Sequence, residues 1–205
     1  MLVFKALSAL LSYPTEPMRE ALPEIERVIA ASPLVPAAQR DALSRLIKEI
    51  GAGDLMSAEE RYVDLFDRGR ALSLNLFEHL HGDSRDRGQA MVELKRLYQA
   101  AGFELATREL PDYLPVLLEY LSRRDLAEAR ELLADCAAIL AAICRSLLAR
   151  RSPYAAVLQA LLVIAGERPI EAEKIPPIPE RPEALDRDWA EEPAFANEAR
   201  APTEH

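Results

Sequence analysis

The chain has 205 residues and a formal net charge of −9, from 25 basic and 34 acidic side chains. An acidic surface repels phosphate backbones, so this charge argues against nucleic acid and favours a partner with a basic segment. The longest uninterrupted apolar run has nine residues, Cys136 to Cys144. A membrane-spanning helix needs about 20, so we expect no membrane insertion. The N-terminal residues lack the features of an export signal, and we expect a cytoplasmic protein.

The composition favours helices throughout the chain. Leu occurs 32 times and Ala 34 times, whereas Val, Ile and Thr occur 8, 10 and 3 times. Only 7 residues are glycine. Leu and Ala have high helix propensity, and few β-branched residues remain to build strands. The composition therefore predicts an all-α protein.

Apolar residues recur at the i, i+3, i+4, i+7 spacing of an amphipathic helix in several stretches. These stretches are residues 43–50, 94–101, 114–121 and 154–161. The longest candidate helix covers residues 126–149, and its apolar stripe is typical of the central helix of a bundle. Together the patterns predict about nine helices in a single bundle domain, which we place at residues 1–168.

Two local signals predict helix ends. Ser57 and Glu60 have the spacing of a capping box, which predicts that Ser57 caps a helix. Gly102 follows the last apolar residue of the 94–101 stretch, where a glycine in the left-handed conformation commonly ends a helix.

The C-terminal stretch differs from the rest of the chain in composition. Residues 170–205 contain 6 of the 15 prolines, with 10 acidic and 4 basic side chains. Such a composition stays extended, so we predict a Pro-rich, acidic tail over residues 169–205. Trp189, the only tryptophan, lies there with Phe195. These aromatics leave open the alternative that the tail docks on the helical domain.

A polar loop between residues 81 and 90 is a candidate site. It contains Arg85, Arg87 and Gly88 ahead of a predicted helix, and free N–H groups at a helix start can bind an anion. The alternative is a capped turn in which Arg–Asp pairs tie the loop to neighbouring helices. No GxxxxGK[ST] or GxGxxG pattern accompanies this loop.

Metal ligation and catalysis find no support in the sequence. His79 and His81 diverge by about 200° on a helix, so they are not expected to share a metal. Cys136 and Cys144 lie among apolar residues, and we interpret them as small core side chains. The two cysteines are not arranged as CxxC, which argues against a zinc site. We expect no metal, no cofactor and no catalytic group.

A second informative stretch precedes the 114–121 pattern. Pro111 and Pro115 fix the backbone at the entry to a helix. Glu109, Asp112 and Tyr113 then either form only the turn before that helix, with Asp112 as its cap, or line the mouth of a groove. In the second case their carboxylates would meet a basic peptide.

Four motifs in these two stretches carry a resemblance to a known family. They are YVDLF at 62–66, LFEH at 76–79, GDSRDRGQAM at 82–91 and LPDYLP at 110–115. With them the chain, over residues 1–165, resembles the NarJ-type nitrate reductase assembly chaperones. These belong with the TorD and DmsD types to the redox-enzyme maturation chaperones. TorD and DmsD types have Asp-His where this chain has Asp112-Tyr113, which fits the nitrate reductase branch.

The resemblance implies a TorD-like, non-catalytic helical protein without a cofactor of its own. It implies binding to the N-terminal, leader-like segment of the nitrate reductase catalytic (alpha) subunit, to assist molybdenum cofactor insertion and complex assembly. Cofactor-biosynthesis proteins are further candidate partners. A dimethyl sulfoxide, trimethylamine oxide or chlorate reductase is the alternative client, and a small helical enzyme that holds a phosphorylated ligand is a remote alternative.

We predict that the peptide lies in an apolar groove with acidic residues at its rim. The predicted peptide-binding residues are Tyr62, Asp64, Leu65, Phe66, Phe77, Glu109, Pro111, Asp112, Tyr113, Leu117, Leu118 and Glu119. Among them, the four carboxylates are expected at the rim, where they would select basic residues of the leader.

Overall fold

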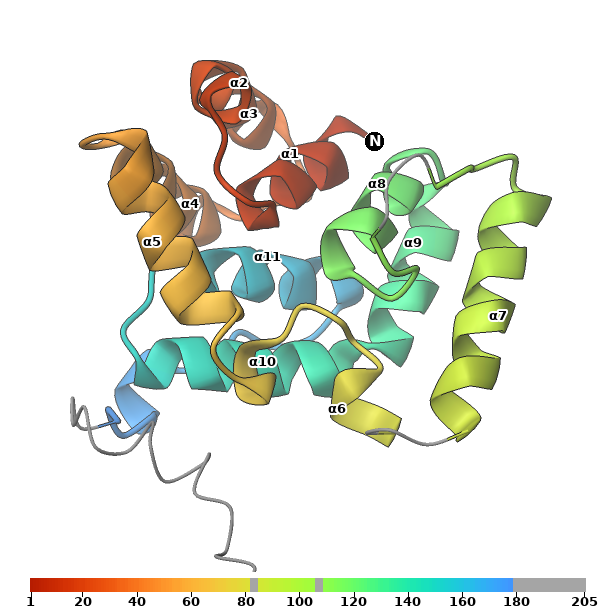
Figure 1. The fold of residues 1–205 in the computed structure, drawn as a ribbon. Coiled ribbons are helices and arrows are strands. Elements are labelled where there is room, and N and C mark those ends of the chain that lie inside the picture. The colour runs from red at the N-terminus through yellow and green to blue at the C-terminus, as the bar shows by residue number, and fades with distance from the viewer. Residues whose placement is uncertain (82–84, 106–108, 179–205) are drawn as a thin grey trace, which may run out of the picture.

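The computed structural model describes residues 1–81, 85–105 and 109–178 (Figure 1). The described elements are α1 (Leu2–Leu11), α2 (Glu16–Glu20), α3 (Leu22–Ala31), α4 (Ala37–Gly51), α5 (Leu55–Phe66), η1 (Arg70–Leu72), α6 (Glu78–His81), α7 (Arg85–Ala100), α8 (Leu114–Ser122), α9 (Leu126–Asp135), α10 (Ala137–Ala149), α11 (Ala155–Ala165) and η2 (Ala172–Lys174).

The all-α prediction is confirmed. In the described ranges there are eleven α-helices, nine of which have nine residues or more. The same ranges contain no β-strand, and their one β-type contact is an isolated antiparallel bridge between Asn75 and Tyr113. The predicted number of nine helices therefore matches the longer elements, and α2 and α6 are short additions.

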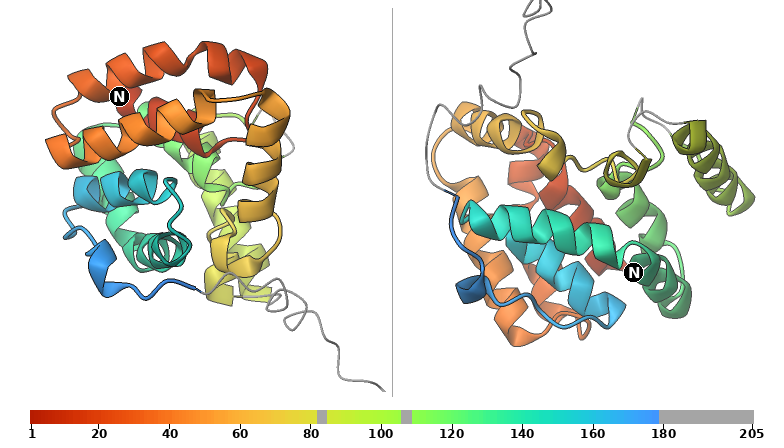
Figure 2. Two further views of the ribbon diagram at one scale, coloured as in Figure 1. Left: turned by 90° about the vertical axis from the view of Figure 1, so that its left-hand side faces the viewer. Right: turned by 90° about the horizontal axis from the view of Figure 1, so that it is seen from below.

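Helix α11 lies at the centre of the fold. Its sequence, AAVLQALLVIA, is apolar on nearly every side, and eight of its residues are buried. A helix without a polar face must be surrounded by other elements. Helices α1, α4, α9 and α10 contact it, and Figure 2 shows α10 running alongside it. The core is therefore organised around α11.

The single long helix predicted over residues 126–149 is wrong. The segment forms two helices, α9 and α10, that are bent by 68° at Cys136. The bend brings both helices into contact with α11, and Leu133 and Ile143 are fully buried. No glycine or proline marks the break in the sequence. Among the described residues, no single helix is long and apolar enough to cross a membrane. Helices α9 and α10 have the required length and hydropathy only when they are taken together across this bend.

The predicted cap at Ser57 is also wrong, because α5 begins earlier. Asp54 is the N-cap residue, and its Oδ1 accepts a hydrogen bond of 2.7 Å from the backbone N–H of Ser57. A carboxylate three residues ahead of the serine thus satisfies the free N–H group at the helix start.

The predicted C-cap at Gly102 is confirmed. Gly102 has φ +67°, and the N–H of Phe103 donates to the carbonyl oxygen of Tyr98 at 2.9 Å. The N–H of Gly102 donates to Gln99 at 3.0 Å, which completes a Schellman motif. The rings of Tyr98 and Phe103 pack edge to face, with centroids 5.5 Å apart. This end fixes the polypeptide as it leaves α7.

The first residues of the predicted tail contact the helical domain. Gln159 exchanges two hydrogen bonds with the backbone of Ile170, at 2.7 and 2.9 Å. The N–H of Ile178 donates to the carbonyl oxygen of Ala149 at 2.9 Å. Trp189 and Phe195 lie outside the described residues. The division into a domain at 1–168 and a tail at 169–205 stays a prediction.

Candidate binding surface at the junction of two motif stretches

The two informative stretches of the sequence meet in the structure. The backbone of residues 74–77 runs beside residues 112–114, where Asn75 and Tyr113 form the isolated bridge. The N–H of Leu76 donates to the carbonyl oxygen of Asp112 at 3.0 Å, and that of Leu114 donates to Leu74 at 2.8 Å. These bonds fix the entry to α6 against the entry to α8.

Asp112 is the side chain that ties this junction together. It is fully buried, and its Oδ2 accepts a hydrogen bond of 3.0 Å from the backbone N–H of Phe77. Its Oδ1 is buried without a hydrogen-bond partner among the described residues. Burial raises the pKa of the Asp112 carboxyl, and the Phe77 N–H and the Arg87 guanidinium only partly oppose this.

The expected position of Asp112 at an exposed rim is therefore wrong. Its carboxylate is directed to the backbone of the preceding stretch, where it accepts the hydrogen bond from the Phe77 N–H. Asp112 does not cap α8 either, because the N-cap residue is Tyr113 and no side chain bonds there. Pro111 is buried beside it, and its carbonyl oxygen accepts a hydrogen bond of 2.8 Å from the Tyr98 hydroxyl.

Arg87 of α7 is held by an acidic neighbour. Its guanidinium pairs with the Glu78 carboxylate at 3.2 Å, and both side chains are largely covered. Gly88 lies inside α7, with open space around it. Residues 82–84 and the side chain of Arg85, which belong to the predicted anion-binding loop, lie outside the described part of the chain. Of the loop's two arginines, the described one serves to connect α6 and α7.

His79 has a structural role. Its Nε2 lies 2.8 Å from the carbonyl oxygen of Ser73, across the turn that leads into α6. Among the described residues no group of three or more His, Cys, Asp or Glu side chains is placed to hold a metal ion.

Tyr62 and Tyr113 form a hydrogen-bonded pair across the junction. The Tyr62 hydroxyl donates to the carbonyl oxygen of Leu11 at 2.8 Å and lies 3.0 Å from the Tyr113 hydroxyl. Because a phenol has one proton, Tyr113 donates to Tyr62 when Tyr62 donates to Leu11. Burial raises the pKa of both phenols, so both stay protonated at neutral pH.

An aromatic cluster surrounds Tyr62. The Tyr62 ring packs against Phe66 with centroids 4.8 Å apart, and Phe66 packs edge-on against Tyr154 at 5.1 Å. Tyr62 also packs against Tyr13 in an edge-to-face arrangement, with ring centroids 5.6 Å apart. Tyr62, Phe66 and Tyr154 are buried, whereas Tyr13 is 44% exposed.

The sequence did not predict Tyr13 and Tyr154 as neighbours of this junction. Tyr154 starts the apolar pattern of its helix and so signals a core position. Tyr13 lies between α1 and α2, and no spacing connects it to the motifs.

The predicted groove residues divide between the core and the surface. Tyr62, Phe66, Leu117 and Leu118 are buried, the two leucines in α8, which packs against α1. These four side chains therefore do not line an open groove, because each is buried within the fold. Pro111 and Asp112 are buried as well. Of the other predicted residues, Leu65, Phe77 and Tyr113 are half-buried, and Asp64, Glu109 and Glu119 are exposed. Asp64 pairs with Arg68 at 2.9 Å.

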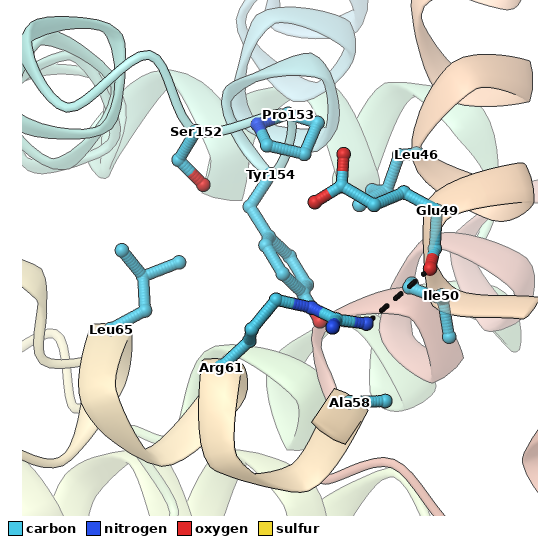
Figure 3. A pocket seen from close by; sticks show the side chains of 9 residues that line it. All are labelled: Leu46, Glu49, Ile50, Ala58, Arg61, Leu65, Ser152, Pro153 and Tyr154. Atoms are coloured by element: carbon cyan, nitrogen blue, oxygen red, sulfur yellow. Dashed lines mark hydrogen bonds between the residues drawn. The ribbon is translucent and has the colours of Figure 1, made fainter. Parts of the chain in front are cut away.

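Leu65 faces a separate small pocket of about 120 Å³ (Figure 3). This pocket lies between α4, α5 and the α10–α11 connection. It is lined by Leu46, Glu49, Ile50, Ala58, Arg61, Leu65, Ser152, Pro153 and Tyr154. Arg61 crosses it and donates to the carbonyl oxygen of Glu49 at 3.5 Å.

A larger hollow, of about 670 Å³, lies elsewhere on the molecule. Its lining residues are Met1, Leu2, Val3, Glu24, Arg27, Val28, Ala31, Ser32, Pro33, Leu34 and Leu126. It adjoins the N-terminal end of α1, whereas Tyr62 binds the C-terminal end at Leu11. None of the predicted peptide-binding residues lines this hollow.

The described residues form an all-helical fold in which the two motif stretches meet at one junction. Comparison with known proteins assigns the family. The family model described as "Nitrate reductase delta subunit" matches residues 14–159. The chain belongs to this family, which confirms the resemblance seen in its motifs.

Three relatives indicate what kind of proteins the family contains. The Escherichia coli K12 nitrate reductase molybdenum cofactor assembly chaperone NarJ is 43% identical over 198 residues, which is 94% of this chain and 84% of NarJ. The probable chaperone NarW of the same strain is 40% identical, over 81% of this chain and 69% of NarW. The probable chaperone NarJ of Bacillus subtilis is 31% identical, over 78% of this chain and 86% of that NarJ. All three names describe chaperones, in agreement with the prediction of a non-catalytic protein.

Proposed function

We propose that this chain is a cytoplasmic chaperone for the assembly of a respiratory nitrate reductase. In this proposal it binds the N-terminal segment of the immature catalytic subunit and keeps that subunit competent to receive the molybdenum cofactor. The observation that carries the proposal is the 43% identity to a protein named as such a chaperone, over 94% of the chain.

The chemistry of the junction supports a peptide ligand. Two leucines near it are exposed to water, Leu80 by 57% and Leu110 by 43%. Phe77 and Tyr113, each three residues away from one of these leucines, are half-buried. Partly exposed apolar side chains beside fixed backbone are suited to an amphipathic segment, which covers them when it binds.

We assign the predicted site residues two different roles. The reachable ones, Phe77, Glu109 and Tyr113 foremost, contact the peptide, with Asp64, Leu65 and Glu119 farther along the surface. The buried ones, such as Asp112 and Leu118, keep the contacting residues in place through the backbone. A binding defect on changing a buried residue would therefore come with a loss of stability.

The test is a calorimetric titration of the protein with a synthetic peptide. The peptide spans the N-terminal segment of the nitrate reductase catalytic subunit from the same organism, and a scrambled peptide of equal composition is the control. Saturable heat for the native order and none for the scrambled order is the expected result. Absence of binding to folded protein at millimolar peptide would contradict the proposal.

The identity of the client can be tested separately. Tagged chain captures its partner in cells grown with nitrate, and mass spectrometry identifies the captured subunit. The nitrate reductase catalytic subunit is expected, with cofactor-biosynthesis proteins as further partners. Recovery of a dimethyl sulfoxide, trimethylamine oxide or chlorate reductase in its place would keep the chaperone role and change the client.

A further inference from the structure

The small pocket between α4, α5 and the α10–α11 connection combines apolar and charged lining residues (Figure 3). We call it the α5 pocket. Its buried lining residues are Leu46, Ile50, Ala58 and Tyr154. Two charged residues that also line it, Glu49 and Arg61, are exposed. The pocket therefore has an apolar interior beside an acid and a base that water can reach.

One wall of the α5 pocket is fixed by the way in which α10 ends. Arg151 has φ +53°, and its N–H donates to the carbonyl oxygen of Leu148 at 2.9 Å. The N–H of Ser152 donates to the carbonyl oxygen of Leu147 at 2.9 Å, and the two bonds form a Schellman motif. Ser152 and the two residues after it line the pocket. This side of the pocket is therefore bounded by backbone that is already in place without a ligand.

The two charged side chains of the α5 pocket are not paired with each other. Arg61 donates to the backbone carbonyl oxygen of Glu49 at 3.5 Å, and the Glu49 carboxylate takes no part in this long bond. Within residues 1–81, 85–105 and 109–178, neither side chain is in an ion pair. Figure 3 shows them extending from α4 and α5 toward the Tyr154 ring. One carboxylate and one guanidinium thus remain to bind a ligand at the pocket.

The size of the α5 pocket limits what can enter it. Its volume is about 120 Å³. An apolar cavity of about 150 Å³ binds benzene, whereas pockets for drug-sized ligands measure about 300–1,000 Å³. The α5 pocket therefore accommodates one apolar group of the size of a leucine or methionine side chain. Glu49 and Arg61 add that a cation and a hydrogen-bond acceptor should lie next to this group.

We propose that the α5 pocket binds the N-terminal residue of the client segment. The side chain of that residue enters the pocket, its α-ammonium pairs with the Glu49 carboxylate, and its carbonyl oxygen accepts from Arg61. Only the first residue of a polypeptide has an α-ammonium beside its side chain, so this arrangement recognises a chain end. The inference rests on the proposed function and adds to it how the chaperone recognises the end of its client.

Other ligands match these groups less completely. A Lys or Arg side chain has its charge at the far end of its stem, so the charge would enter the apolar interior at a high desolvation cost. Phosphate would meet the Glu49 carboxylate as a like charge. A free apolar amino acid has the same ammonium and side chain, with a carboxylate in place of the carbonyl group. It is the nearest alternative, and the experiment distinguishes it.

The experiment titrates the full chain with a client peptide that begins with methionine. The peptide is made with a free N-terminal amine, with an acetylated amine, and with glycine in place of its methionine; free methionine is titrated separately. Glu49→Gln and Arg61→Gln remove the two charges of the pocket. Glu60→Gln and Arg45→Gln make the same chemical changes at exposed positions outside it and serve as matched controls.

We expect acetylation to weaken binding to the unmodified chain by about threefold to tenfold, because it removes the ammonium that pairs with Glu49. Glu49→Gln should weaken binding of the free-amine peptide by the same factor and leave the acetylated peptide unaffected. The two changes remove one contact, so their effects should not add. Arg61→Gln should weaken both forms equally, since both retain the carbonyl oxygen.

The apolar contact has its own expected result. Glycine in place of the peptide's methionine should weaken binding by about tenfold or more, because no side chain then fills the pocket. The two control variants, Glu60→Gln and Arg45→Gln, should bind every form of the peptide as the unmodified chain does.

The outcomes separate this inference from the proposed function. If the unmodified chain binds no form of the peptide, the proposed function fails. If it binds the free and acetylated forms equally, only the assignment of the α5 pocket is overturned, and binding of free methionine that Glu49→Gln abolishes would then assign the pocket to a free amino acid. Equal loss of both forms in Glu49→Gln would also overturn it, because Glu49 would then act through the fold. Thermal unfolding of every variant identifies such a structural effect.

Discussion

The substitution Leu118→Ala distinguishes a groove residue from a core residue. The sequence predicts Leu118 in an open peptide groove, where its truncation would weaken peptide binding with little change in stability. In the structure its side chain is fully buried in α8, which packs against α1. Replacing a buried leucine by alanine costs about 2–5 kcal/mol, from lost burial and from the cavity that remains.

For a protein of this size, each kcal/mol lowers the melting temperature by about 2–4 °C, so Leu118→Ala should melt on the order of 10 °C lower. Urea unfolding followed by circular dichroism measures the free energy, and calorimetry measures the melting temperature. Leu2→Ala is the matched control, because this leucine is 70% exposed and its truncation should change stability by less than about 0.5 kcal/mol. Unchanged stability of Leu118→Ala, together with lost peptide binding, would refute the assignment to the core.

Three further predictions concern backbone, charge and thiols. Gly102→Ala should destabilise the protein by about 1 kcal/mol in urea unfolding, because Gly102 has φ +67°. Gly88→Ala, in open space within α7, should stabilise it by about 0.5–1 kcal/mol. A change of the same sign in both variants would contradict this prediction. Burial raises the pKa of the Asp112 carboxyl above its ordinary value of 3.8. As the pH rises, this carboxyl therefore loses its proton at a lower pH in the unfolded state than in the folded state. The free energy of unfolding falls as the pH rises between these two pKa values. Asp112→Asn, which stays neutral, should therefore gain stability relative to the unmodified chain as pH rises above 4. If the free energies of unfolding of the two proteins changed in parallel with pH, the Asp112 carboxyl would not be the cause of the pH dependence. Burial raises the pKa of the Cys136 and Cys144 thiols to about 11 and about 12, so both should react slowly with a disulfide reagent at pH 8 and rapidly in urea.

Local signals in the sequence were sufficient to predict where most of the helices lie. The apolar pattern of residues 43–50 corresponds to buried positions of α4, where Leu43, Leu46, Ile47 and Ile50 all lie in the core. Gly102 ends α7 as predicted, because the need for a positive φ depends on the residue itself. The motifs also indicated the family, since they are short, contiguous and local to two stretches.

The surface assignments were less accurate, because exposure depends on what packs against a residue. Leu117 and Leu118 have an apolar spacing that fits a groove as well as a core, and in the structure both are buried in α8, which packs against α1. The bend at Cys136 follows from packing both α9 and α10 on α11, and no residue type in that segment predicts a bend. Tyr13 lacks any sequence signal of its proximity to Tyr62.

The sequence by itself determined the class of fold, the positions of most helices, the family and the acidic character of the protein. These follow from propensity, periodicity and short motifs, which act over a few residues. Only the tertiary structure decided that Asp112 is buried against the backbone of Phe77, and that Tyr13 and Tyr113 meet through Tyr62. Those contacts join residues 35 to 51 positions apart, and their geometry depends on how whole helices pack.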